Sequence, residues 1–83
     1  MNAAVQEYRD LLAKFLIGNV TVGEFEVLFL VKFKNETRQL GQRAFSVLNE
    51  LLGDIEAFGD DRDEAALRVK VESAVTQLGI LDT

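Results

Sequence analysis

The chain contains no cysteine, no histidine and no proline among its 83 residues. Without cysteine there is no disulfide, no thiolate nucleophile and no sulfur ligand for a metal, and nothing indicates an oxidising compartment. Without histidine, the commonest general base and the commonest metal ligand are missing. Ser46 and Ser73 have no base to activate them, and residues 18–23 lack the lysine and spacing of a phosphate-binding loop. We therefore expect a protein that is not an enzyme and has no catalytic residue, metal or cofactor.

Long apolar runs are also missing. The longest, Val27 to Val31, is followed by Lys32 and Lys34, and a membrane helix needs about 20 apolar residues. The opening residues Met1 to Asp10 have neither the basic region nor the apolar region of a secretory signal. We expect a soluble, cytoplasmic protein without a membrane partner.

Negative charge is unevenly distributed in a chain whose formal net charge is −5. Residues 1–49 carry five acidic and six basic side chains, whereas residues 50–83 carry nine acidic and three basic ones. Nucleic-acid binding relies on clustered Lys and Arg, so we do not expect a nucleic-acid partner. An acidic C-terminal half suits a partner with a cationic surface.

The length and the 48% hydrophobic content predict one folded domain over residues 1–83. Apolar residues recur every three or four positions over residues 2–16, and Gly18-Asn19 offers a left-handed C-cap. Thr21 and Glu24 fit a capping box that opens a second helix through Lys32. That segment is apolar nearly all round and rich in strand formers, so a strand is the alternative for it.

A third apolar stripe runs from Phe45 to Phe58, and Gly59 is expected to end its helix. Asp61, with Glu64 as its partner, is predicted to cap a last helix that ends near Gly79. Four amphipathic helices with short connections predict an all-α, antiparallel four-helix bundle. The aromatic residues expected in its core are Phe15, Phe25, Phe29, Phe45 and Phe58.

Two groups of acidic residues differ in the structural reason for their presence. Asp60, Asp61 and Asp63 precede a helix, where carboxylates cap free amides and favour the helix dipole. Glu50, Asp54 and Glu56 lie in the last half of a helix, where the dipole disfavours negative charge. Glu50 and Asp54 are also four residues apart and repel each other. A cationic partner explains this second group better than local stability does, and an ordinary solvated face is the alternative.

Four stretches resemble colicin D-type immunity proteins: LLAKFL at 11–16, TVGEF at 21–25, LNELLGDIEAF at 48–58 and LRVKV at 67–71. The resemblance implies a four-helix bundle that inactivates a bacterial toxin nuclease acting on tRNA. In such a complex the immunity protein covers the cationic active-site cleft and imitates the phosphates of the RNA. Family members often have a longer acidic insert before the last helix than residues 58–67 provide. The partner-binding residues that the resemblance implies are Glu50, Asp54, Glu56, Asp60, Asp61 and Asp63.

An alternative function uses the apolar surface of the second helix. In this alternative, the chain is a helical adaptor or a homodimerisation module, with Val27, Leu30 and Phe33 at the interface. Salt distinguishes the two functions, because electrostatic association slows at high ionic strength whereas apolar dimerisation does not.

Overall fold

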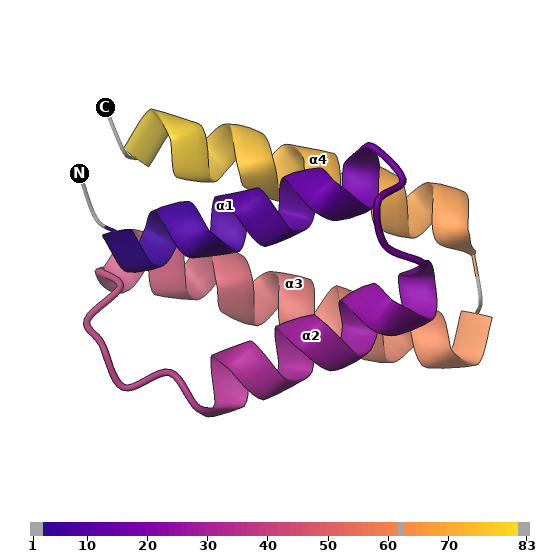
Figure 1. Ribbon diagram of the computed structural model, residues 1–83, viewed down its shortest axis with the longest axis horizontal. Helices are drawn as coiled ribbons and strands as arrows, with labels where there is room; N and C mark the ends of the chain where they lie inside the picture. The colour runs from indigo at the N-terminus through magenta and orange to yellow at the C-terminus, as the bar shows by residue number, and fades with distance from the viewer. Residues whose placement is uncertain (1–2, 62, 82–83) are drawn as a thin grey trace.

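The described residues form four helices and no strand, which confirms the all-α prediction and excludes the strand alternative for the second segment. This computed structural model describes residues 3–61 and 63–81, and for residues 59–61 and 81 it describes the backbone alone. The helices are α1 (Ala3–Leu16), α2 (Val22–Lys34), α3 (Gln42–Asp61) and α4 (Glu64–Leu81). Successive helices run in opposite directions, so that the start of α1 and the end of α4 lie at the same end of the bundle (Figure 1).

Two of the predicted helix ends are confirmed in detail. Gly18 has φ +84°, and the amide of Asn19 donates to the carbonyl oxygen of Lys14 at 2.9 Å, which is the hydrogen bond of a Schellman C-cap. Thr21 and Glu24 form the predicted capping box: the Thr21 hydroxyl accepts from the Glu24 amide, and the Glu24 carboxylate accepts from the Thr21 amide. The short connection formed by residues 17–21 therefore makes the tight turn that sets α2 against α1.

The predicted end of α3 and the predicted cap of α4 are wrong. α3 continues through Gly59 to Asp61, so Asp61 belongs to α3 and does not cap α4. Asp63 is the cap, because its carboxylate accepts from the Ala66 amide at 3.1 Å. The sequence offered two aspartates within three positions of each other, and a glycine within the last turn costs a helix only about 1 kcal/mol.

Gly79 does not end α4 either, since that helix reaches Leu81. A Cβ atom at Gly79 would lie 3.3 Å from Nη2 of Arg9, so the glycine makes room for an α1 side chain that lies over α4. The glycine marks a close approach of two helices and not a helix terminus.

The buried core contains most of the predicted stripes of α1, α3 and α4, and two residues of α2, Phe25 and Phe29. Its aliphatic and aromatic members are fully enclosed, and those with no exposed surface are Tyr8, Leu12, Phe15, Phe25, Phe29, Leu48, Val71 and Leu78. Phe15 and Phe25 stack with their ring centroids 4.5 Å apart. α3 packs most extensively on α4, α4 also packs on α1, and α2 packs mainly on α1. α2 is therefore the least embedded helix of the bundle.

One aromatic prediction is wrong: Phe45 is 52% exposed. Its ring lies 5.6 Å from that of Phe33, at the edge between α3 and α2, instead of pointing into the core. Leu40, which precedes α3, and Ala44, in its first turn, are buried. Within the part of the chain that the structure describes, none of the helices combines the length and the apolarity that crossing a bilayer requires.

Candidate functional site

Two acidic residues of the N-terminal half, Glu7 and Glu36, form ion pairs within the bundle. Glu7 on α1 forms ion pairs with Lys32 at 2.6 Å and with Arg38 at 2.9 Å. Arg38 also pairs with Glu36 at 2.7 Å, and the buried Tyr8 hydroxyl donates to the same Glu36 carboxylate at 3.0 Å. Lys32 and Arg38 thus tie α2 and the following connection to α1.

These contacts shift the ionisation of the groups involved. Hydrogen bonds from Arg38, and then from Lys32, lower the pKa of Glu7 from 4.5 to about 2. Arg38 is also the main cause that lowers the pKa of Glu36 to about 2. Burial, followed by the hydrogen bond to Glu36, raises the pKa of Tyr8. Both carboxylates are therefore ionised at neutral pH and their charges are balanced from within the chain.

Acid should weaken the fold through this cluster. Because folding lowers the pKa values of Glu7 and Glu36, their ion pairs contribute stability above about pH 4.5 and lose that contribution as the pH falls toward 2. In the variant Arg38→Met both carboxylates lose their main partner, so the fall in urea midpoint between pH 6 and pH 2.5 should shrink to roughly half or less. Glu50→Gln is the control and should show the full fall. An equal fall in wild type and Arg38→Met would contradict the role given to the cluster.

The acidic residues of the C-terminal half have few partners. Among the described side chains, Glu50, Asp54 and Glu56 form no ion pair and no hydrogen bond. Glu50 and Glu56 are exposed, and Asp54 is half-buried. Asp63 is exposed but caps α4, so only part of its carboxylate is available. The backbones of Asp60 and Asp61 are helical, and their side chains lie outside the described part of the chain.

The structure brings Glu50 and Asp54 together on one side of α3. The two residues lie about 40° apart around the helix axis. Both line a depression between α3 and α4, which Lys70, Ser73 and Gln77 complete from the α4 side. Glu56 lies about 160° from Asp54 around the same axis. The three predicted α3 acids therefore do not form one continuous face.

Glu72 on α4 is a further acid that the sequence reading did not single out. It is exposed and, among the described side chains, has no ion pair. It lines a shallow depression with Ser73 and Gln77, the two α4 residues that also border the depression of Glu50 and Asp54. Its position one residue after the buried Val71 would have placed it on the outer face of α4. We call Glu50, Asp54, Glu72, Ser73 and Gln77 the α3/α4 surface.

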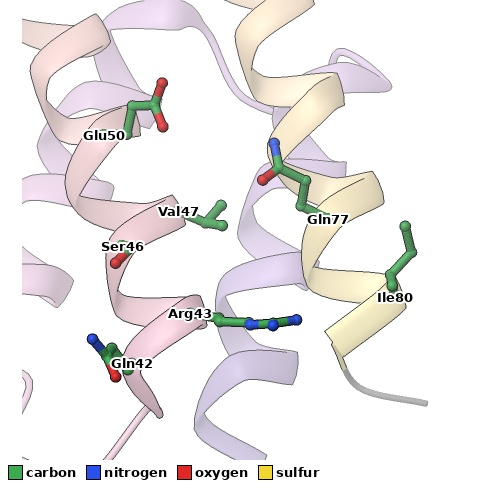
Figure 2. A pocket seen from close by; sticks show the side chains of 7 residues that line it. All are labelled: Gln42, Arg43, Ser46, Val47, Glu50, Gln77 and Ile80. Atoms are coloured by element: carbon green, nitrogen blue, oxygen red, sulfur yellow. The ribbon is translucent and has the colours of Figure 1, made fainter.

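A larger groove continues from this surface along α3 and α4. It has a volume of about 560 Å³, and Glu50 and Gln77 lie in both the groove and the neighbouring depression. Figure 2 shows Arg43 extending from α3 toward α4, while Gln77 and Ile80 line the opposite side. Apolar groups in the groove can pack the aliphatic stem of a long cationic side chain while a carboxylate meets its charged head. The groove itself contains one carboxylate, Glu50, and one guanidinium, Arg43.

The fold and this surface define an all-α four-helix protein with unpaired carboxylates on one side. No group of three or more acidic side chains in the described residues is placed to hold a metal ion. Comparison with known protein families, with characterised proteins and with solved structures found no match to the chain.

Proposed function

We propose that this chain is a cytoplasmic immunity protein, which neutralises a toxin nuclease of the colicin D or contact-dependent-inhibition kind by covering its cationic cleft. One observation carries the proposal. Glu7 and Glu36 are paired within the bundle, whereas Glu50, Asp54 and Glu72 have no partner among the described side chains. Carboxylates that the bundle does not use are available to an external cation.

The chemistry of a nuclease supplies such cations. An enzyme that grips a phosphate backbone must line its cleft with Lys and Arg. Carboxylates on a rigid helix can meet these groups with charge-assisted hydrogen bonds, and a guanidinium can bind a carboxylate through two of them. Inhibition of this kind blocks the cleft and needs no chemical step. Complementary charge also speeds encounter, which suits an inhibitor that must reach the toxin before the toxin reaches its substrate.

The predicted contact residues differ in how directly they would contact the toxin. Glu50 and Asp54 are central because they share the depression with α4, and Glu72 extends the same surface. Glu56 lies on the other side of α3 and would contact only a partner that wraps around that helix. Asp63 caps α4, so only part of its carboxylate would be available to the toxin. For Asp60 and Asp61, the structure gives only their backbone position in the last turn of α3.

Association with the toxin nuclease domain encoded beside this chain tests the proposal. The two proteins should co-purify, and the nuclease should lose activity on RNA when the chain is present. The association rate should fall at least about tenfold between 50 mM and 500 mM salt, because screening removes the attraction between the surfaces. Failure to associate at low salt, or an association rate independent of salt, would contradict the proposal.

A further inference from the structure

The outer face of α2 is apolar and uncovered. Phe25 and Phe29 point inward and are fully buried, whereas Val27 is 62%, Leu28 46% and Val31 56% exposed. These three residues are adjacent on one side of a helix that is packed mainly against α1. Isolated exposed apolar residues are common, but a group on one helix face is typical of an interaction surface.

Opposite charges stand at the two ends of this face. Glu24 lies in the first turn of α2 and Lys34 in the last turn, and both are exposed. At 100° per residue, Glu24, Val27, Val31 and Lys34 fall within a sector of about 80°. Hydrogen bonds from Thr21 hold the pKa of Glu24 below its ordinary value, so this carboxylate is ionised at neutral pH. Its Oε1 atom accepts from the Thr21 amide, which leaves the second oxygen for another donor.

This order of residues is complementary to itself in one orientation. Suppose that two copies of α2 pack antiparallel through their outer faces, with residue 29 at the midpoint of each helix. Position 24 then meets position 34 of the other copy, and position 27 meets position 31. Glu24 then faces Lys34 twice and Val27 faces Val31 twice, as an isologous two-fold interface requires. A parallel pair would instead place Glu24 against Glu24 and Lys34 against Lys34. We propose that the outer face of α2 binds a second copy of this chain, antiparallel, about a two-fold axis that passes between Val27 and Val31.

The dimer does not depend on the function proposed above. α2 and α4 lie on opposite sides of the bundle (Figure 1), so the α3/α4 surface stays open in each copy. An interface of one helix face is at the small end of specific interfaces, and its dissociation constant should be on the order of 10⁻⁵ M. Each dimer would present two acidic surfaces.

Sedimentation equilibrium over a range of concentrations tests the dimer. Wild type should change from monomer to dimer as its concentration rises from about 1 to about 300 µM. Val31→Lys should raise the dissociation constant at least about 100-fold, because each copy would place a lysine against Val27 of the other. Val69→Lys is the matched control, since Val69 is 64% exposed on α4, and it should leave dimerisation unchanged. A wild type that stays monomeric throughout this range, or a dimer insensitive to Val31→Lys, would overturn the proposal.

Cysteine cross-linking tests the orientation, because the natural chain has no cysteine. In an equimolar mixture of Val27→Cys and Val31→Cys chains under mild oxidation, the disulfide between positions 27 and 31 should predominate over those joining identical positions. Predominance of the disulfides between identical positions would indicate a parallel pair and overturn the antiparallel arrangement. The result does not bear on nuclease binding, so the two proposals can fail separately.

Discussion

Phe29→Ala should lower the free energy of unfolding by about 3–5 kcal/mol, the usual cost of removing a buried phenylalanine. Phe29 has no exposed surface, and its ring contacts those of Tyr8, Phe25 and Phe33 with centroids 5.7–6.1 Å apart. A domain of this size has a total stability of roughly 4–12 kcal/mol. The loss should therefore lower the melting temperature by at least about 12 °C. The measurement is thermal unfolding followed by circular dichroism.

Val31→Ala is the control for this prediction, because Val31 lies on the same helix but is 56% exposed. At a concentration low enough to keep the chain monomeric, its cost should be below about 0.5 kcal/mol. Equal losses in the two variants would mean that α2 does not bury the face containing Phe29, and the packing of α2 on α1 would be wrong.

Glu50→Lys combined with Asp54→Lys should abolish neutralisation of the toxin. Close charge pairs at a protein interface are coupled by roughly 1.5–7 kcal/mol each. Reversing two carboxylates that meet cations should therefore weaken binding at least about 100-fold, since two such pairs contribute about 3 kcal/mol or more and about 1.4 kcal/mol corresponds to a factor of ten. Neither carboxylate has an ion pair in the described part of the bundle, so the far-ultraviolet circular dichroism should be unchanged. Survival of cells producing the toxin is the measurement.

Asp10→Lys combined with Glu26→Lys changes the net charge of the chain by the same amount. These residues lie on α1 and α2, away from the α3/α4 surface. The control variant should still protect cells, with at most a modest loss in association rate. Equal loss of protection in both double variants would mean that overall charge matters and the position of the carboxylates does not.

The parts of the fold that could be predicted from the sequence are those with local causes. The capping box of Thr21 and Glu24 uses residues three positions apart, and Gly18 is needed where φ is positive. The wrongly predicted helix ends depend on a choice between two similar capping residues or on a contact with a residue distant in the sequence. Asp61 and Asp63 were equally good caps in sequence, and Gly79 is explained only by the approach of Arg9 from α1.

The candidate site was predicted in part for the same reason. The structure places Glu50 and Asp54 beside α4, but it puts Glu50 in the first half of α3 and not in the last half, because α3 extends to Asp61. Glu56 was grouped with them, although helix periodicity separates it by about 160° from Asp54. Glu72 could be added only when the packing of α3 on α4 brought Ser73 and Gln77 next to the α3 carboxylates.

Helical periodicity wrongly placed Phe45 in the core. Periodicity identifies the apolar face of α3, but it does not show how much of that face the shorter helix α2 covers. α2 spans 13 residues and α3 spans 20. Phe45 lies at the edge of α3 and is partly covered by Phe33 of α2, with 52% of its surface still exposed. Relative helix lengths and positions decide such cases.

The central claim is that Glu50, Asp54 and Glu72 meet cations of a partner protein. Its most direct test is to compare backbone amide signals of the isotope-labelled chain in nuclear magnetic resonance spectra recorded with and without the toxin nuclease domain. The largest changes should occur at these three residues and at Ser73 and Gln77, and the signal of Asp10 on α1 should be unchanged. Changes confined to α1 and α2, with the signals of Glu50, Asp54 and Glu72 unmoved, would contradict it.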